Sequence, residues 1–391
     1  MSAVRLGNVG ESGQPLDKVV LFAATGLMLF GLVMVTSASS EVAARNYGHP
    51  LYLALKHGVF MAAGCAGFLA ALMLPVRVWQ RLGWILYAAS VGLLVLVMVP
   101  GIGHEVNGAT RWIPLGAFTL QGSEFVKLFT IVFLAAYLAK PDSRHQDHLG
   151  AYLLPLALTG VLVILLLLQP DFGACVVIMS AVLAVMFFSG APMRYFLPTL
   201  LGGGAVVVLL VALQPYRLAR LISFTDPWAH QFGGGYQLTQ ALIAIGRGEW
   251  FGLGLGNSVQ KLFFLPEAHT DFLFSIVVEE LGIAGAILVL LGFTVLVIQG
   301  LLIGKRCYQG GFTFHGNLAT GISILIGVQA LINLGVNLGL LPTKGLTLPL
   351  MSFGGNSLVV TLLMIGLLLR LDWESRLAPA APKKSGGRRA K

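Results

Sequence analysis

Long apolar runs follow one another along most of the chain, with short polar breaks between them. A helix needs about 20 mostly apolar residues to cross the hydrocarbon core of a bilayer, and the runs approach or exceed that length. The pattern therefore predicts an all-α polytopic membrane protein with about ten transmembrane helices. The apolar runs cover residues 19–39, 52–74, 83–101, 122–139, 151–168, 172–189, 195–213, 272–303, 316–341 and 355–370.

The longest break, residues 214–270, separates the seventh and eighth runs and predicts a large periplasmic segment. Pro215 suits the first turn of a helix in the membrane interface, with Arg217 and Arg220 directed towards lipid headgroups. Apolar residues then recur at helical spacing up to Gly246, which predicts a short amphipathic helix with a glycine stop. The main loops expected on the same face are Glu41–Pro50, Gly103–Leu120 and Leu341–Gly354.

Basic residues mark the ends of alternate breaks, and Lys and Arg are enriched in the cytoplasmic loops of membrane proteins. With an even number of helices, this pattern predicts that both termini are cytoplasmic. We expect a cytoplasmic N-terminal segment over 1–18, a transmembrane domain over 19–371, and a basic, disordered cytoplasmic tail over 372–391. The basic positions outside the tail that we assign to the cytoplasmic side are Arg5, Lys18, Arg77, Arg81, Lys140, Arg144, Arg194, Lys305 and Arg306.

Composition narrows the class of protein. The chain is 57% hydrophobic and only 10% charged, whereas soluble domains carry roughly 25% charged residues. This composition excludes a water-soluble fold. The net charge of +9 does not indicate nucleic-acid binding, because the basic residues mostly mark the cytoplasmic side of the membrane. The N-terminus lacks the pattern of a removable signal peptide, so we expect the first helix to be retained. The three cysteines, Cys65, Cys175 and Cys307, form neither a disulfide framework nor a metal-ligand spacing.

Ionisable residues inside apolar runs are costly, so each one needs a partner or a function. Glu124 and Lys127 are three residues apart and share a helix face. Two interpretations stay open, a structural ion pair or the lining of a polar cavity. Deeper in the eighth run, Glu279 and Glu280 are expected to accept hydrogen bonds from neighbouring polar groups.

The densest group of titratable side chains, Glu267, His269 and Asp271, directly precedes the eighth apolar run. If the helix begins near Thr270, Asp271 lies in its first turn, where the helix dipole favours a carboxylate. A capping role is one interpretation of Asp271. We favour a catalytic one, because acid and base groups meet here at the water interface.

A series of short motifs is similar in sequence and order to one family of cell-envelope membrane proteins. The most diagnostic are Pro266–Phe272 (PEAHTDF) and Leu341–Pro349 (LPTKGLTLP). On these motifs the chain resembles the SEDS family, with Gly122 in place of a usual proline and Asn356 in place of a usual serine. Thr343 and Lys344 resemble its cell-division (FtsW-like) branch, in a Gram-negative bacterium. The other motifs are Asn107–Ile113, Gln121–Lys127, Gln169–Gly173, Gly235–Gly246, Gly254–Lys261 and Ser352–Ser357.

The resemblance implies a peptidoglycan glycosyltransferase that polymerises lipid II at the division septum, on the outer face of the inner membrane. Its partners would be the nascent glycan strand, a class B penicillin-binding protein (an FtsI-like transpeptidase) and other divisome membrane proteins. Two alternatives are a lipid II flippase and a non-catalytic division scaffold. A flippase would have a similar composition, but it would form no glycan chains in detergent.

The family chemistry is inverting, with a polyprenyl pyrophosphate leaving group, and it assigns Asp271 as the general base. No tightly bound cofactor is expected, although a loosely held divalent cation, Mg²⁺ or Mn²⁺, is compatible with the chemistry, with Glu267 as a candidate ligand. The candidates for binding substrate or pyrophosphate are Arg111, Trp112, Glu124, Lys127, Lys261, Glu267, His269, Lys344 and Ser352.

Overall fold

Every apolar run predicted from the sequence forms a helix in the computed structural model, which describes residues 16–106, 109–116, 118–140 and 148–377. Within these residues, eight helices are long and apolar enough to cross a membrane, and α4 and α6 are shorter, with 17 residues each. The predicted all-α, multi-pass fold is confirmed. The bundle comprises α1 (Lys18–Tyr47), α2 (Tyr52–Met73), α3 (Val76–Met98), α4 (Gly122–Leu138), α5 (Leu149–Leu168), α6 (Phe172–Phe188), α7 (Met193–Ala212), α10 (Leu273–Gln309), α11 (Thr313–Asn337) and α12 (Gly355–Leu377).

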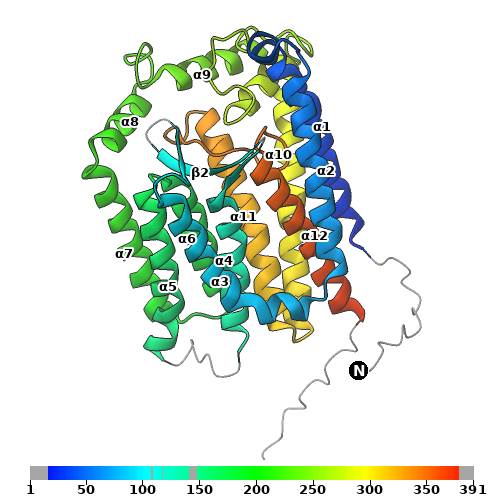
Figure 1. Ribbon diagram of the computed structural model, residues 1–391, viewed down its shortest axis with the longest axis vertical. Helices are drawn as coiled ribbons and strands as arrows, with labels where there is room; N and C mark the ends of the chain where they lie inside the picture. The colour runs from blue at the N-terminus through cyan, green and yellow to red at the C-terminus, as the bar shows by residue number, and fades with distance from the viewer. Residues whose placement is uncertain (1–15, 107–108, 117, 141–147, 378–391) are drawn as a thin grey trace, which may run out of the picture.

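The helices differ sharply in how much of their surface the protein covers. In α4 every residue except Phe125 and Phe129 is buried, and α11 and α12 are also largely buried, whereas α7 has no buried residue. Figure 1 shows α11 inside the bundle and α7 at its edge. Polar side chains on α4 and α11 therefore face other helices, and polar groups buried in this way must be satisfied by protein partners.

A small antiparallel sheet replaces the loop expected after α3. It consists of β1 (His104–Val106), β2 (Ala109–Leu115) and β3 (Phe118–Gln121), with β2 in the centre. Trp112 of β2 is opposite Gln121 of β3. The strands are short and their pattern is irregular, which hid them in the sequence. Asn107 and Gly108 lie outside the described residues.

The boundary of α1 differs from the prediction. Glu41–Pro50 was expected to be a loop, but the helix continues to Tyr47. It stops where Gly48 adopts a left-handed conformation (φ 72°) and donates its N–H to the Ala44 carbonyl. A glycine C-cap, rather than the end of the apolar run, therefore sets this boundary.

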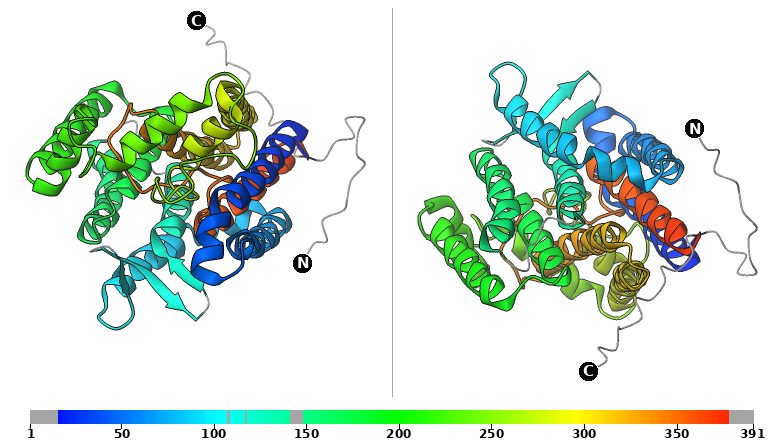
Figure 2. Two further views of the ribbon diagram at one scale, coloured as in Figure 1. Left: turned by 90° about the horizontal axis from the view of Figure 1, so that it is seen from above. Right: turned by 90° about the horizontal axis from the view of Figure 1, so that it is seen from below.

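Two short helices cross one end of the bundle between α7 and α10 (Figures 1 and 2). These are α8 (Pro215–Thr225) and α9 (Tyr236–Gly248). Both helices were predicted, and Pro215 occupies the first turn of α8 as expected. The predicted glycine stop at Gly246 is wrong, because α9 continues to Gly248 and its C-cap is Glu249, with a φ of 44°.

The run expected as one continuous helix, α10, is broken at Gly282, whose φ is 68° and ψ is −163°. The break frees backbone groups that the segment after α9 satisfies. Leu253 and Gly254 donate their N–H groups to the carbonyls of Glu279 and Glu280, and Ile283 donates its N–H to the carbonyl of Glu249. The segment that follows α9 is thereby fixed to α10 by backbone bonds.

The two ends of the described chain meet at the end of the bundle opposite α8 and α9. Asp17 caps α1 and forms ion pairs with Arg306 near the end of α10 (3.1 Å) and Arg376 near the end of α12 (3.4 Å). Burial raises the pKa of Asp17, but hydrogen bonds from Gln299, Arg306 and the Val20 N–H outweigh burial and hold that pKa below its usual value. Residues 1–15, 141–147 and 378–391 lie outside the described residues, so Arg5, Arg144 and a disordered tail beyond residue 377 stay predictions. The predicted start of the tail at residue 372 is wrong, because α12 continues to Leu377.

Candidate active site

Asp271 lies two residues before α10 and is held through its backbone by α11. Its carbonyl accepts hydrogen bonds from Asn333 Nδ2 (2.8 Å) and Asn337 Nδ2 (3.0 Å). Asn337 Oδ1 accepts in turn from the N–H (3.1 Å) and hydroxyl (2.8 Å) of Ser275 in the first turn of α10. The helix begins at Leu273 rather than near Thr270, and Asn337 satisfies its first turn. The capping role considered for Asp271 is therefore wrong.

The Asp271 carboxyl is half-buried, and its charge state is set by opposing neighbours. Burial, and after it the Glu267 carboxylate, raise the pKa of Asp271, while Arg111 and Arg220 lower it, and the net result is a pKa of about 7. Its Oδ2 lies beside Gly345, where an added Cβ would be 3.1 Å away. A carboxyl group that titrates near neutral pH and keeps an open side suits a general base.

Glu267 and His269 flank Asp271 but differ in accessibility. Glu267 is exposed, has a positive φ of 56°, and accepts a 2.7 Å hydrogen bond from the Thr270 hydroxyl. Burial lowers the pKa of His269 although Glu267 opposes the shift, and its ring lies 5.6 Å from that of Phe353. Glu267 is therefore open to a ligand, while the His269 ring packs against the loop before α12.

Arg111 of β2 is fixed to the break between α5 and α6. Its guanidinium donates to the carbonyl of Gln169 (3.2 Å) and to that of Pro170. Gln169 Nε2 donates to the Leu94 carbonyl of α3 (2.7 Å), so three parts of the bundle meet here. Trp112, the next residue of β2, is half-buried. The sheet thus directs Arg111 towards the region of Asp271, where its charge opposes the rise in the Asp271 pKa.

Glu124 and Lys127 form a buried ion pair on α4 with an N···O distance of 2.8 Å. Lys127 Nζ also donates to Gln329 Oε1 of α11 (2.6 Å). Gln329 Nε2 donates to the Thr347 carbonyl (3.0 Å) in the loop after α11. The pair is therefore structural, and it also supports the loop that carries Gly345.

The remaining candidates on that loop have different surroundings. The Lys344 ammonium lies 4.2 Å from the centre of the Phe172 ring at the start of α6. Ser352 is buried, and its hydroxyl accepts a 3.0 Å hydrogen bond from the Leu348 N–H. Lys344 is half-buried beside Gly345, whereas Ser352 stabilises a turn. The buried, hydrogen-bonded hydroxyl disfavours a substrate role for Ser352, and the substrate role of Lys344 stays a prediction.

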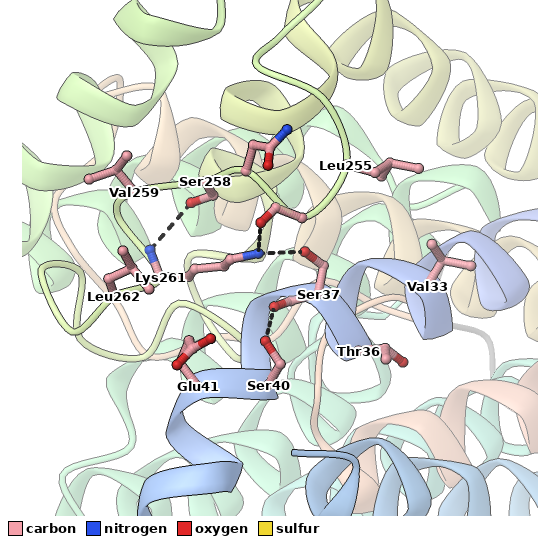
Figure 3. A pocket seen from close by; sticks show the side chains of 12 residues that line it. Val33, Thr36, Ser37, Ser40, Glu41, Leu255, Ser258, Val259, Lys261 and Leu262 are labelled. Carbon is pink, nitrogen blue, oxygen red and sulfur yellow. Dashed lines mark hydrogen bonds between the residues drawn. The ribbon is translucent and has the colours of Figure 1, made fainter.

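Lys261 is separated from the other candidates by its partners. It is buried, pairs with Glu280 (3.1 Å), and donates to the Ser37 hydroxyl of α1 (3.1 Å) and the Gly256 carbonyl (2.6 Å). Figure 3 shows Lys261 directed at Ser37 on the wall of a pocket. These contacts argue against the pyrophosphate-binding role considered for Lys261. Glu279 and Glu280 do accept hydrogen bonds, as expected, from a set that includes Ser258.

Sequence reasoning missed four polar residues of the site: Arg220, Gln329, Asn333 and Asn337. Arg220 was expected to face lipid headgroups, but its guanidinium donates to the Thr343 carbonyl (3.2 Å). The other three are buried amides of α11. Their spacing of four residues places them on one helix face, which is the signal that could have identified them.

In the part of the chain that the structure describes, no group of three or more His, Cys, Asp or Glu side chains is placed to hold a metal ion. The fold and site define a multi-pass membrane protein with a titratable carboxyl group, flanked by basic side chains, at one end of its bundle. The chain belongs to the FTSW_RODA_SPOVE family of cell cycle proteins, whose model matches residues 17–377. The resemblance to the SEDS family is therefore confirmed.

Curated relatives place the chain in the FtsW branch, as predicted. A protein of Pseudomonas fluorescens (strain SBW25) named "Probable peptidoglycan glycosyltransferase FtsW" is 49% identical over 364 residues, covering 93% of this chain and 89% of the relative. A protein of the same name from Alcanivorax borkumensis is 48% identical over 361 residues, covering 92% of this chain and 94% of the relative.

Solved structures share the fold. A chain of a structure described as "Structural coordination of polymerization and crosslinking by a peptidoglycan synthase complex" is 30% identical, with a TM-score of 0.75, and the match covers 93% of this chain and 99% of that one. The Thermus thermophilus rod shape determining protein RodA is also 30% identical, with a TM-score of 0.69 and coverage of 93% and 98%.

Proposed function

We propose that this chain is a peptidoglycan glycosyltransferase that polymerises lipid II into glycan strands for septal wall synthesis. The observation that carries the proposal is Asp271, a half-buried carboxyl with a pKa of about 7 between basic side chains. The relatives named peptidoglycan glycosyltransferase support the same reaction class.

In the proposed reaction, the 4-hydroxyl of the acceptor sugar attacks the anomeric carbon of the lipid-linked donor. Asp271 takes the hydroxyl proton as the new C–O bond forms. The bond from the anomeric carbon to the pyrophosphate oxygen breaks, and polyprenyl pyrophosphate leaves with the electron pair, which inverts the configuration. The positive charges of Arg111 and Lys344 stabilise the negative charge that develops on the leaving group.

The proposal includes a loosely held divalent cation, Mg²⁺ or Mn²⁺. Glu267 raises the pKa of Asp271, so the two carboxylates repel each other, and a cation that Glu267 helps to hold would relieve this repulsion. A single carboxylate such as Glu267 suits a cation whose other positions are filled by water and phosphate oxygens. When bound, such a cation would neutralise charge on the pyrophosphate.

We assign the protein to the bacterial inner membrane at the division septum, with both termini cytoplasmic. Lys305 and Arg306 lie near the end of α10 that is remote from Asp271, which supports this orientation. Asp271 then faces the periplasm, where lipid II is consumed. The solved complex of polymerization and crosslinking supports a class B penicillin-binding protein as the partner, together with other divisome membrane proteins.

Reconstitution tests the proposal. The purified protein would be mixed in detergent with labelled lipid II, with and without a class B penicillin-binding protein, and with Mg²⁺, Mn²⁺ or a chelator. We expect glycan chains on a gel, more of them with the partner, and fewer with the chelator. A flippase would give none, because detergent leaves no second compartment. Failure to form chains under all of these conditions would overturn the proposal.

A further inference from the structure

A second cavity adjoins the candidate active site and has not been given a role above. Its volume is about 490 Å³, and it lies between α8 and the start of α9. Its residues are Ala219, Arg220, Ser223, Gly233, Gly234, Tyr236, Gln237, Pro266 and Thr343. We call it the Arg220 pocket.

The lining of the Arg220 pocket suits an anion. It offers one guanidinium, the hydroxyls of Ser223 and Tyr236, and the side-chain amide of Gln237. None of the described residues that line it is acidic. A planar guanidinium with several N–H donors, supported by neutral donors, is the arrangement that binds phosphate oxygens most effectively.

The backbone of the pocket wall is closely packed. A Cβ added to Gly234 would lie 2.7 Å from the Ser223 hydroxyl oxygen, and one added to Gly235 would lie 2.8 Å from the Pro227 carbonyl. The glycine segment therefore lies directly against α8 and the residues after it. The Thr239 hydroxyl of α9 also donates to the Pro227 carbonyl (3.0 Å). The start of α9 is thus fixed beside Arg220, which makes this a formed pocket.

The pocket shares its rim with the candidate active site. Pro266 directly precedes Glu267, and Thr343 directly precedes Lys344. Arg220 is bound to the Thr343 carbonyl, and its charge lowers the pKa of Asp271 against the effect of burial. An anion in the pocket would therefore be close to a sugar whose reacting hydroxyl is at Asp271.

We propose that the Arg220 pocket binds the pyrophosphate of a lipid-linked substrate, with Arg220 as its main ligand and Ser223, Tyr236 and Gln237 as neutral donors. This inference rests on the proposed function, because it names the place where that reaction holds its leaving group. The same chemistry is present in uncleaved lipid II and in the product, undecaprenyl pyrophosphate. The experiment must therefore separate these two sources.

The test compares Arg220→Gln, Arg220→Lys and Gln237→Ala with the wild type. Arg45→Gln is the control, because Arg45 is an exposed arginine that lies over the Phe263 ring (4.8 Å) and does not line the pocket. For each protein, reconstituted with its partner, the KM for lipid II and the inhibition constant of undecaprenyl pyrophosphate would be measured. Thermal stabilisation by undecaprenyl pyrophosphate and by undecaprenyl phosphate gives a readout without turnover.

Arg220→Gln should raise the KM, the inhibition constant or both by about tenfold or more, as expected for a lost hydrogen bond to a charged group. Arg220→Lys should raise these constants less than Arg220→Gln does, because lysine keeps the positive charge but lacks the planar guanidinium. Gln237→Ala should have a smaller effect, and Arg45→Gln should match the wild type. An effect on KM alone assigns the pocket to lipid II, and an effect on inhibition alone assigns it to the product.

Two results would separate failure of this inference from failure of the proposed function. If the wild type polymerises lipid II while folded Arg220→Gln and Gln237→Ala bind both pyrophosphates normally, the pocket assignment is wrong. If the wild type makes no glycan, the proposed function is wrong, and the stabilisation measurements still decide whether Arg220 binds pyrophosphate. If Arg220→Gln does not fold, Arg220→Lys and Gln237→Ala give the same decision.

Discussion

Two buried lysine–glutamate pairs have the same chemistry but different positions in the fold. Lys127 and Glu124 belong to one helix, α4, and are 2.8 Å apart. Lys261 and Glu280 join a loop to α10 and are 3.1 Å apart. Each lysine has a further partner that decides what the pair supports.

The further partners divide the end of the bundle that carries α8 and α9 into two regions. Lys127 reaches Thr347 through Gln329, so the first pair supports the loop that faces Asp271. Asp271 and this loop form the reacting region. Lys261 bonds Ser37 of α1 and lies beside the break in α10, so the second pair fixes the segment after α9. We call this second part the anchoring region. A buried ion pair alone does not therefore mark an active site.

The strongest test of this division is Asp271→Asn in the reacting region. The change keeps the size of the side chain and removes its capacity to accept a proton. Polymerisation should fall by roughly 10²–10⁴-fold, the range for a lost acid-base group. The backbone bonds from Asn333 and Asn337 do not use the carboxyl group, so folding and partner binding should persist.

Glu267→Gln is the matched control, because it removes a neighbouring carboxylate that lies in the loop before α10. It should reduce polymerisation less than Asp271→Asn does. Gel analysis of the glycan product, with melting temperature as a check of folding, measures both variants. Near wild-type polymerisation by folded, partner-bound Asp271→Asn would refute the assigned mechanism.

The two ion pairs provide the second test. Changing Lys261→Met alone leaves Glu280 buried without its lysine and should cost about 3–5 kcal/mol of stability. Adding Glu280→Gln should restore most of it, and activity should recover with it. Each single change, Glu124→Ala or Lys127→Ala, should likewise be more harmful to stability than the double change.

The two regions should differ in the polymerisation activity of their double variants. Loss of Lys127 also removes the bond to Gln329, so the Glu124→Ala/Lys127→Ala protein should regain stability without full polymerisation. Thermal unfolding in detergent and the glycan assay would be measured on the same samples. Equal recovery of activity in both double variants would show that the two regions are not distinct, and additive losses would argue against pairing.

The comparison also explains what the sequence could predict. A helix places residues three apart on one face, so the pairing of Glu124 and Lys127 could be predicted from their spacing. The partner of Glu280 could not, because Lys261 approaches it only after a loop docks into the break at Gly282. The same holds for Arg220, which a helical pattern directs to lipid headgroups but tertiary structure directs to the Thr343 carbonyl.

The helices themselves were predictable because a bilayer requires long apolar runs, and all ten predicted runs formed helices. The ends of the helices were harder to predict. Gly48 ends α1 beyond the apolar run, and Asn337 caps α10 from another helix, so neither boundary follows from the local apolar pattern. The position of Asp271 before α10 was recognised through its motif, but its pKa depends on charges from β2, α8 and the preceding loop.

The pH dependence of polymerisation is the third test. Because the raised pKa of Asp271 is about 7, its carboxyl group is mostly protonated at pH 6 and mostly ionised at pH 8. A general base must be ionised, so the rate should rise about tenfold across this interval. Initial rates measured in folded protein would test it. A flat profile would show that Asp271 does not titrate in this range. As a control, the double variant Lys261→Met/Glu280→Gln should leave the midpoint of the pH profile unchanged.

The smallest expected effect concerns Gly345, which tests whether the open side of Asp271 matters. A Cβ at position 345 would meet only Asp271 Oδ2, at 3.1 Å, within 4 Å. Gly345→Ala should therefore crowd the carboxylate without disturbing the surrounding packing. A single added methyl group in a tight site costs about 1 kcal/mol or more, which corresponds to a roughly fivefold slower reaction. Gly246→Ala on α9 is the matched control, because its added Cβ meets nothing within 4 Å. Rates of lipid II polymerisation for the two variants, at equal melting temperature, give the comparison. If Gly345→Ala reacts as fast as Gly246→Ala, the acceptor hydroxyl does not approach Asp271 from this side.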